Sequence, residues 1–404
     1  MTDVTSSAPD HRLGRSRRVR RTDRAKFRRR RILVAFLVVF VIFAAVVGPS
    51  LGSALTNPSL GSSVGARFAE WTRSHGGNGV VNWVENLWYS HHQPKAGGAP
   101  PKGAIKVPTS ATRPTATTLP HLAAPAAIVP PATPPLPGEG QWSPAGRTVG
   151  GSPAVYVTRL RPDPVHTSLV VGAAWMDTKL LRAQLYSGSF IPGGGPYTYS
   201  APVKPDAAAT LVAAFNSGFQ MSSANGGYYT EGRTVVPLRQ GAASLVITKE
   251  GVPTVALWGR DATLSPDVAS VRQNLDLLVD GGAPVPGLNA SDTTRWGATL
   301  GNQIYVWRSG VGVTADGALV YVGGPGLNIT SLADLLVRAG AVRAMELDIN
   351  TDWVHFATYS PATPTGAATS SNGANLLPDM VGTPSRYFTT WWSRDFITMS
   401  ASTG

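Results

Sequence analysis

Residues 341–350, AVRAMELDIN, decide the fold that we expect for this sequence. Apolar and polar side chains alternate along them, which is typical of a strand with one face in a core. The apolar face holds Met345, Leu347 and Ile349. The opposite face holds Glu346, Asp348 and Asn350. A core strand that ends in carboxylic acids needs either a structural or a functional explanation.

The two carboxyl groups of this strand allow two interpretations. Glu346 and Asp348 are neighbours on one face, about 6.5–7 Å apart along a strand. This is near the separation at which two carboxyl groups flank a sugar bond as acid and base. The structural alternative is an ion pair between one acid and Arg343 or Arg308, on a face that is open to solvent. The strand pattern leaves both interpretations open.

From about residue 139 onward, the residue pattern of the chain is typical of a domain built of β-strands. Short apolar and β-branched runs recur there between Gly, Asp and Pro. They are AVYVTRL (154–160), SLVVGAAW (168–175), ATLVAAF (209–215), ASLVITKEGVPTVALW (243–258), LDLLVDGG (275–282) and QIYVWRSGVGVTADGALVYVGG (303–324). Two of these runs contain hairpin turns, Glu250-Gly251 and Asp316-Gly317.

One helix is predicted in this region, at residues 332–339. Ser331 is placed to cap it with Asp334 three residues later, and Gly340 is placed to end it. We therefore expect residues 139–404 to form an α+β domain with a mixed or antiparallel sheet and few helices.

The basic character of the chain is concentrated in its first 31 residues, which hold twelve Lys or Arg against three Asp. The remaining residues hold 23 basic and 20 acidic side chains, so a nucleic-acid surface on the folded part has little support. Residues 32–47 are sixteen consecutive apolar residues, and 32–52 are long enough to cross a bilayer. An uncleaved anchor with a cytoplasmic N-terminus fits this arrangement better than a removed signal peptide.

Two further segments separate the anchor from the sheet domain. Residues 53–92 are expected to contain two amphipathic helices, either at the membrane surface or packed on the main domain. Residues 93–138 are rich in Pro, Ala and Thr, and we interpret them as a stalk. The chain has no cysteine, which excludes disulfides, a thiol nucleophile and Cys-ligated metals, and seven histidines spread along the chain do not favour a zinc centre.

Two other constellations point to ligand binding. The run ending at Phe215 leads directly into Asn216, Ser217 and Gly218, and the stretch 224–233, ANGGYYTEGR, follows. Glycines allow backbone N–H groups to approach a ligand, while Asn, Ser and Tyr supply uncharged donors for sugar hydroxyls or phosphate oxygens. The second constellation is Arg308, whose guanidinium matches a phosphate, before a glycine-bracketed hairpin. A plain turn and a structural arginine are the alternatives.

The order of these motifs resembles the phosphodiester glycosidases related to N-acetylglucosamine-1-phosphodiester α-N-acetylglucosaminidase. Asn216-Ser217-Gly218-Phe219 is similar to the Asn-Gly-Gly-Phe element of that family, and Arg308-Ser309-Gly310-Val311-Gly312 to its Arg-containing strand. Residues 329–350 are similar to its helix and final strand, with Asp348 at the position of the family's Asp. The likeness covers roughly residues 150–400. Ile349-Asn350-Thr351 replaces a glycine triplet, and Glu346 stands where Asn is common.

The resemblance implies an extracytoplasmic hydrolase that cleaves a sugar-1-phosphodiester in a glycan or cell-envelope polymer. The expected catalytic residues are Asp348, Glu346, Arg308 and Asn216. The expected substrate-binding residues are Ser217, Gly218, Gly227, Tyr228, Arg233, Asn350, Thr351 and Asp352. No cofactor is expected, although Glu346, Asp348 and Asp352 could bind a hard cation such as Ca²⁺ through oxygen alone.

Two other functions are consistent with the sequence. A non-catalytic glycan-binding or scaffold protein of the envelope would keep the fold without the chemistry, as the lost glycine triplet suggests. The other is a protein-interaction domain that recruits partners through residues 59–90.

Overall fold

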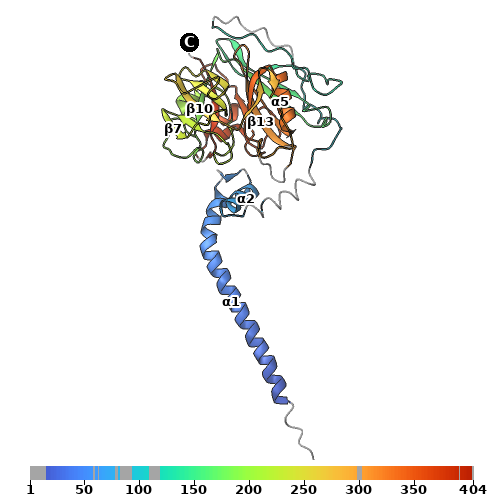
Figure 1. The fold of residues 1–404 in the computed structure, drawn as a ribbon, viewed down its shortest axis with the longest axis vertical. Coiled ribbons are helices and arrows are strands. Elements are labelled where there is room, and N and C mark those ends of the chain that lie inside the picture. The colour runs from blue at the N-terminus through green and yellow to red at the C-terminus, as the bar shows by residue number, and fades with distance from the viewer. Residues whose placement is uncertain are drawn as a thin grey trace, which may run out of the picture. The chain divides into compact units, whose positions relative to one another are not determined.

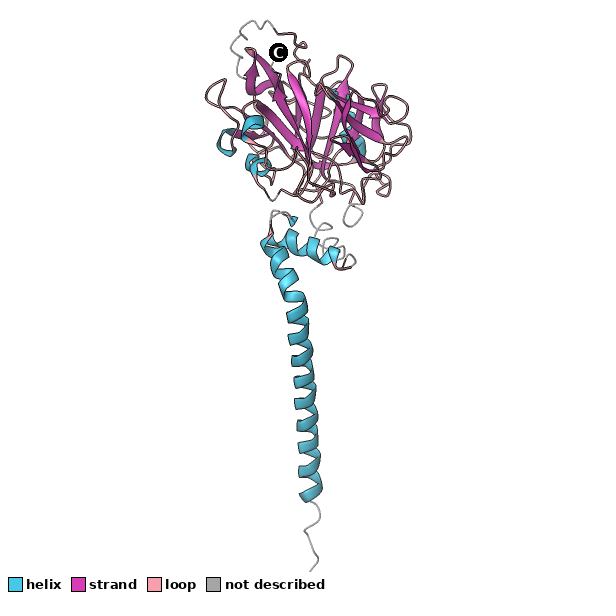
Figure 2. Cartoon of the chain, turned by 90° about the vertical axis from the view of Figure 1, so that its left-hand side faces the viewer, coloured by secondary structure: helices cyan, strands magenta, loops and turns pink. Residues whose placement is uncertain are grey.

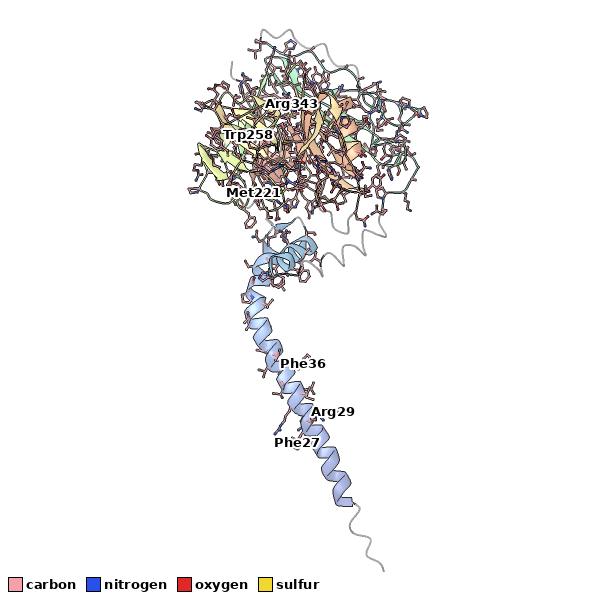
Figure 3. All side chains as sticks on the ribbon, in the orientation of Figure 1. Phe27, Arg29, Phe36, Met221, Trp258 and Arg343 are labelled. Carbon is pink, nitrogen blue, oxygen red and sulfur yellow. The ribbon has the colours of Figure 1, made fainter. Side chains whose placement is uncertain are left out.

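The computed structural model describes residues 15–57, 60–61, 63–77, 81, 93–108, 119–297, 303–390 and 392–402. The chain divides into two compact units, residues 1–57 and 58–404. In the first unit, helix α1 (Arg15–Thr56) includes a stretch, Phe27–Thr56, that is long and apolar enough to cross a membrane. Phe27, Arg29 and Phe36 project outward from this helix (Figure 3), and Phe36 is 76% exposed. An apolar N-terminal helix of this kind is compatible with an anchor or a signal sequence.

The second unit is built mainly of antiparallel β-strands, with few helices (Figure 2). Its described strands are β1 (Ser143–Val149), β2 (Ser152–Leu160), β3 (Val171–Met176), β4 (Leu181–Tyr186), β5 (Leu211–Asn216), β6 (Tyr228–Thr230), β7 (Arg233–Val236), β8 (Ala243–Thr248), β9 (Pro253–Leu257), β10 (Val268–Gln273), β11 (Leu277–Asp280), β12 (Ala283–Pro284), β13 (Val306–Thr314), β14 (Leu319–Leu327), β15 (Ala341–Glu346), β16 (Phe356–Tyr359), β17 (Gly373–Asn375) and β18 (Phe396–Ala401). Its described helices are α2 (Val64–Ser74), α4 (Pro205–Ala208) and α5 (Ile329–Arg338), with 3₁₀ turns Ser370–Asn372 and Pro384–Phe388.

The strands form three sheets. The first has eight strands in the order β1-β2-β3-β14-β13-β15-β11-β12. The other two have five strands each, in the orders β7-β6-β10-β8-β9 and β17-β16-β5-β18-β4. The pairings between these strands are antiparallel, and parallel pairing is found in the described chain only at isolated bridges. The sheet is therefore mostly antiparallel, and the mixed alternative has little support.

The two predicted hairpins are confirmed. β8 pairs with β9 across Glu250-Gly251, and β13 pairs with β14 across Asp316-Gly317. Gly251 and Gly317 have φ values of 77° and 91°, a region where a side chain would be strained, so glycine suits each turn. Each predicted strand run overlaps a strand, but residues 347–350 of the run 341–350 lie beyond β15, which ends at Glu346.

The predicted helix is present but begins earlier than expected. α5 starts at Ile329 because Asn328 is the N-cap, accepting a hydrogen bond from the Ser331 N–H at 2.8 Å. Ser331 closes the capping box from the third position, so the prediction that Ser331 is the cap was wrong. Gly340, with a φ of 94°, follows the helix as predicted. α5 lies against β13, β14 and β15 (Figure 1).

The segments before residue 139 are described only in part. α2 accounts for the first predicted amphipathic helix, whereas the second lies mostly outside the described residues. Parts of the Pro-rich segment contact the domain: Ile128 is buried in a core cluster with strand residues, and its N–H donates to the Gly140 carbonyl at 2.9 Å. The stalk itself stays a prediction.

The apolar face predicted for residues 341–350 is confirmed in its first part. Met345 and Leu347 are both buried in the largest core cluster, among residues of all three sheets. The opposite face is also closed to solvent, since Glu346 is 0% and Asp348 6% exposed. A solvated acidic face is therefore excluded, and the acids are held inside the domain.

Candidate active site

The predicted carboxyl groups lie where strands of the first and third sheets end beside one another. Asp348 follows β15, and its N–H donates to the Ser217 carbonyl, which follows β5, at 3.1 Å. Its own carbonyl accepts from the Ser309 N–H at 3.1 Å and from Ser309 Oγ at 2.7 Å, on β13. Both backbone polar groups of Asp348 are thus satisfied. The backbone of Asp348 is fixed by contacts with the segment after β5 and with β13.

The Asp348 carboxyl is only partly used by the protein. Its Oδ1 accepts hydrogen bonds from the N–H groups of Ile349 (2.8 Å) and Asn350 (3.2 Å), whereas Oδ2 receives none from the described residues. Burial raises the pKa of Asp348 to about 6; the Arg394 guanidinium and these N–H groups oppose the rise, and Asp395 adds to it. Asp348 thus offers one oxygen to a ligand and titrates close to neutrality.

Glu346 forms a closed ion pair with Arg308. Arg308 Nη1 donates to Glu346 Oε1 at 2.5 Å, and both side chains are at most 2% exposed. Arg308 also donates to the carbonyls of Trp296 (3.2 Å) and Leu327 (3.3 Å). The structural alternative of a pairing with Arg308 is therefore confirmed for Glu346, although the pair is buried rather than solvated. Arg343 instead donates to the Val255 carbonyl at 2.7 Å.

The pair is electrostatically coupled to Asp348. Burial raises the pKa of Glu346 to about 7, with the Arg308 guanidinium opposing and the Asp348 charge adding to the rise. Glu346 Oε2 is buried and receives no hydrogen bond from the described residues. The contacts of Arg308 favour a positioning role over the direct contact with phosphate that we expected.

Asn216 is likewise occupied by protein partners. Its Nδ2 donates to Ser309 Oγ (3.0 Å) and to the Ser217 carbonyl (2.9 Å). Its Oδ1 accepts from Tyr321 Oη and from the His355 N–H, both at 2.9 Å. The amide thus orients the residues that hold Asp348, and these contacts favour positioning rather than the expected hold on substrate.

Sequence reasoning missed two charged residues at this site, Arg394 and Asp395. Asp395, just before β18, accepts from the Ser217 N–H through its carbonyl at 3.3 Å. Asp395 Oδ2 pairs with Arg272 Nε at 2.7 Å, while Oδ1 is buried without a partner among the described residues. Arg394 Nη1 and Ser217 Oγ are also buried without a described partner. Ser217 was predicted, but Arg394 and Asp395 gave no signal beyond a charged pair after an aromatic run.

The predicted glycines shape the neighbouring backbone. Gly218 is required because a Cβ there would lie 2.9 Å from Asn274 Oδ1, the atom that accepts from the Phe219 N–H at 3.0 Å. Gly227 is packed more tightly, since a Cβ there would lie 2.3 Å from the Pro237 carbonyl oxygen.

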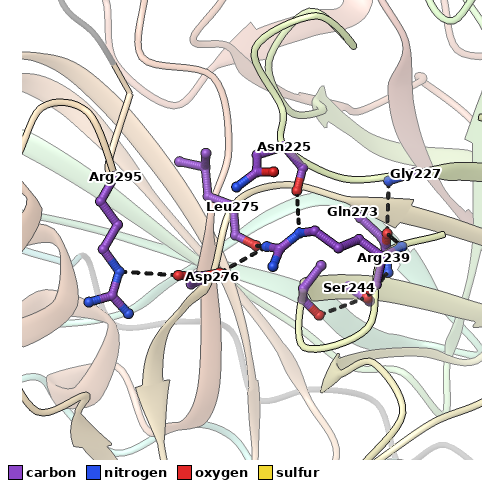
Figure 4. A network of polar contacts seen from close by, with 9 residues as sticks. Asn225, Gly227, Arg239, Ser244, Gln273, Leu275, Asp276 and Arg295 are labelled. Atoms are coloured by element: carbon purple, nitrogen blue, oxygen red, sulfur yellow. Dashed lines mark hydrogen bonds and ion pairs between the residues drawn. The ribbon is translucent and has the colours of Figure 1, made fainter. Parts of the chain in front are cut away.

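The Gly227 N–H is used by a polar network (Figure 4). It donates to Gln273 Oε1 at 2.8 Å, the same atom that accepts from the Arg239 N–H at 2.7 Å. Gln273 in turn donates to Ser244 Oγ at 3.1 Å. Gly227 is therefore fixed by its protein contacts, and its N–H is not available to a ligand.

The other predicted substrate-binding residues divide into two groups. Tyr228 is fully buried, with its Oη 3.2 Å from Ser187 Oγ and its ring 5.8 Å from the Arg272 guanidinium, so it packs behind the Arg272–Asp395 pair. Arg233 lies elsewhere: it donates to the Gly194 and Pro196 carbonyls and stacks on Tyr197. The structure does not bring Arg233 to Asp348.

The turn after Asp348 replaces the expected glycine triplet without losing its backbone donors. The N–H groups of Ile349 and Asn350 are directed at Asp348, and Asn350 Oδ1 accepts from the Asp352 N–H at 2.8 Å. Thr351 is half-buried in the same turn. No three acidic or histidine side chains gather as a metal site within the described residues, so the proposed Ca²⁺ set of Glu346, Asp348 and Asp352 has no geometric support.

Residues 209–348 match the family model of phosphodiester glycosidase. The chain carries a phosphodiester glycosidase family domain. The match begins just before β5 and ends at Asp348, so it includes Asn216, Arg308 and Glu346. Arg394 and Asp395 lie beyond the matched part of the phosphodiester glycosidase domain.

Solved structures with a similar chain path have low sequence identity. The catalytic domain of zebrafish N-acetylglucosamine-1-phosphodiester α-N-acetylglucosaminidase, auto-inhibited by its pro-peptide, is 14% identical, with a TM-score of 0.39 over 65% of this chain and 88% of that one. A hypothetical protein from Synechocystis is 13% identical, with a TM-score of 0.35 over 64% of each chain. No curated protein sequence matches the chain.

Proposed function

We propose that the protein hydrolyses a sugar-1-phosphodiester in a glycan or cell-envelope polymer, with Asp348 as the residue that acts at the anomeric carbon. The observation that carries this proposal is the Asp348 carboxyl itself. It ends the segment matched by the family model, its backbone is fixed from β5 and β13, and Oδ2 receives no hydrogen bond from the described residues. A carboxyl that is firmly held yet incompletely bonded is suited to react with a ligand.

Cleavage of a sugar-1-phosphodiester requires one ionised carboxyl group that acts as a base or a nucleophile. It does not require a strong acid. Ionised Asp348 either takes a proton from a water that attacks C1 or attacks C1 itself. In both cases the bond between C1 and the phosphate oxygen breaks, and the phosphate monoester leaves with the electron pair. A phosphate monoester is stable as an anion, so the leaving group needs little protonation. Glu346 is then a positioning residue, together with Arg308 and Asn216.

The first unit of the chain supports a location for this activity outside the cytoplasm. The apolar stretch Phe27–Thr56 is preceded by Arg-rich residues, which favour retention in the cytoplasm. We assign the protein a single membrane anchor, a cytoplasmic N-terminus and an extracytoplasmic domain, with residues 93–138 as the connecting stalk. The partner is then a polymer of the cell envelope rather than a soluble metabolite.

The test is turnover by the full chain purified in detergent. A panel of sugar-1-phosphodiesters that differ in sugar is incubated with the wild-type protein and with Asp348→Asn, and the released reducing sugar is measured. Release that requires Asp348 supports the proposal. Glycan binding without product from any substrate would instead indicate the non-catalytic envelope protein, and a partner that requires residues 59–90 but not Asp348 would indicate the interaction domain.

A further inference from the structure

Arg394 differs from the other buried arginines of the domain in having no acceptor. The other buried arginines, each at most 9% exposed, are Arg147, Arg161, Arg272, Arg308 and Arg386. Each of these donates to a carboxylate or to backbone carbonyls. Arg394 is 8% exposed and donates no hydrogen bond to any described residue, and its Nη1 is wholly buried. An uncompensated buried cation is costly, so a functional reason is needed.

Packing fixes the guanidinium without neutralising it. Its carbon lies 4.3 Å from the centre of the Trp353 ring, a stacking distance that orients the plane of the group. No carboxylate of the described chain lies within ion-pair distance of it, in contrast to Arg272, which is paired with Asp395 at 2.7 Å. The planar fork of donors therefore remains available for a bidentate acceptor.

The place of Arg394 in the fold is the candidate active site. The next residue, Asp395, shares Ser217 with Asp348 through backbone hydrogen bonds of 3.3 and 3.1 Å. Arg394 is close enough to Asp348 for its charge to favour ionisation of that carboxyl. Arg394 and Asp348 are thus linked through the backbone of Asp395 and Ser217, and the Ser217 hydroxyl is itself buried without a described partner.

We propose that Arg394 binds the phosphate of the substrate and makes the site select a phosphodiester over an uncharged glycoside, an inference that rests on the proposed function. Phosphate oxygens are the acceptors that a guanidinium fork matches best. Arg308, the arginine expected in this role from the sequence, uses its Nε and Nη1 for Glu346 and two carbonyls, and its charge is paired with Glu346. Arg394 makes neither a hydrogen bond nor an ion pair with any described residue, so all of its donors are unused.

The binding test uses inorganic phosphate and protein that cannot turn over substrate. Asp348→Asn in the full chain is titrated with phosphate by calorimetry, alone and combined with Arg394→Gln or with Arg295→Gln. Arg295 is the matched control because it also stacks on a tryptophan, Trp296, at 4.6 Å, but it is exposed and already paired with Asp276 at 3.1 Å (Figure 4).

We expect phosphate affinity to fall by about 10- to 100-fold with Arg394→Gln, the usual range for a hydrogen bond to a charged group, and to be unchanged with Arg295→Gln. Affinity that survives Arg394→Gln, affinity lost equally in both variants, or no phosphate binding in any protein would each overturn the inference. If Arg394→Gln does not fold, Arg394→Lys is used in its place, because it keeps the charge without the planar fork. We expect it to lower phosphate affinity as well, but by less than Arg394→Gln.

A second measurement separates phosphate binding from an effect on Asp348. With the reactive Asp348 present, rates are compared at the high-pH plateau, where Asp348 is ionised with or without Arg394. There, Arg394→Gln is expected to lower kcat/KM for a sugar-1-phosphodiester about 10- to 100-fold and to leave an uncharged aryl glycoside of the same sugar unaffected. Equal losses for both substrates would show that Arg394 acts only through Asp348. Phosphate binding that needs Arg394, without turnover of any substrate, would contradict the proposed function but support this inference.

Discussion

Asp348 and Asp395 are held on opposite sides of one residue, Ser217. The Ser217 carbonyl accepts from the Asp348 N–H at 3.1 Å, and the Ser217 N–H donates to the Asp395 carbonyl at 3.3 Å. One acid follows β15 of the eight-stranded sheet, and the other precedes β18 of a five-stranded sheet. The positions of the two acids therefore depend on how the two sheets are joined through the backbone of Ser217.

Asp348→Asn is expected to abolish turnover while preserving the turn. The amide oxygen of Asn can still accept from the N–H groups of Ile349 and Asn350, as Asp348 Oδ1 does now. The variant lacks the charge that acts at C1, so we expect kcat to fall by at least about 100-fold. Sugar release from a phosphodiester measures this, with circular dichroism as the control for folding. Turnover within twofold of wild type would rule out Asp348 as the reactive group.

Activity should rise with pH through the pKa of Asp348. That pKa is raised by burial to about 6, and the reactive form is the ionised one. We expect kcat/KM to increase tenfold per pH unit below about pH 6 and to level off above it. A pH–rate profile from pH 4 to 8 on a substrate whose own ionisation is constant tests this. A rate that falls as pH rises through 6 would mean that Asp348 acts as an acid.

The same pKa predicts a stability difference between wild type and Asp348→Asn. Because the pKa of Asp348 is raised in the folded state, the folded protein binds the proton more tightly than the unfolded chain. The contribution of Asp348 to the free energy of unfolding is present at low pH and is lost as pH rises from about 4 through 6. Since the pKa moves from 3.8 to about 6, the loss amounts to at most about 3 kcal/mol. Urea unfolding at pH 4 and pH 8 should show the variant gaining stability relative to wild type at the higher pH.

Breaking the buried Arg308–Glu346 pair should destabilise the fold. Arg308→Met leaves Glu346 buried and without its 2.5 Å partner, and we expect a loss of about 3–5 kcal/mol in the free energy of unfolding. The double variant Arg308→Met/Glu346→Leu removes both charges and should recover much of that loss. Urea unfolding of Arg308→Met, of Glu346→Leu and of the double variant gives the coupling free energy between the two residues. Additive losses would show that the pair is not coupled.

Gly227→Ala should be more damaging than Gly232→Ala. A Cβ at Gly227 would lie 2.3 Å from the Pro237 carbonyl oxygen, so the β6–β7 segment would have to move. Gly232 has a φ of 74° but open space around it, so alanine there costs only the backbone strain of about 1–2 kcal/mol. Thermal unfolding should show a clearly lower Tm for Gly227→Ala. Equal losses would mean that the neighbouring loop yields easily.

The elements of the fold that rest on local pattern could be predicted from the sequence. The alternation at 341–350 indicated the buried Met345 and Leu347, and the Gly251 and Gly317 turns indicated two hairpins. The start of α5 was predicted three residues late because Asn328 and Ser331 both suit a cap, and only the geometry distinguishes the cap from the third position.

The site was predictable only where its residues belong to such a pattern. The strand pattern marked Asp348 as one of two candidate carboxyl groups, and the order of the motifs then singled it out. The partners of Arg308 and Asn216 come from distant segments. The sequence offered Arg343 and Arg308 alike as partners for an acid, without showing that Arg308 pairs with Glu346. Nothing in the local sequence shows that Tyr321 and His355 donate hydrogen bonds to Asn216. Arg394 and Asp395 had no spacing signal, because their role depends on β18 lying next to β5.

The position of β18 sets the order in which the site can be completed during synthesis. This strand is inserted between β5 and β4, although both of those strands are made far earlier in the chain. A ribosome or a translocation channel must therefore release residues 394–401 before the last side chains reach Asp348. The side chains of Arg394 and Asp395 would then be missing from the site until residues 394–401 have emerged.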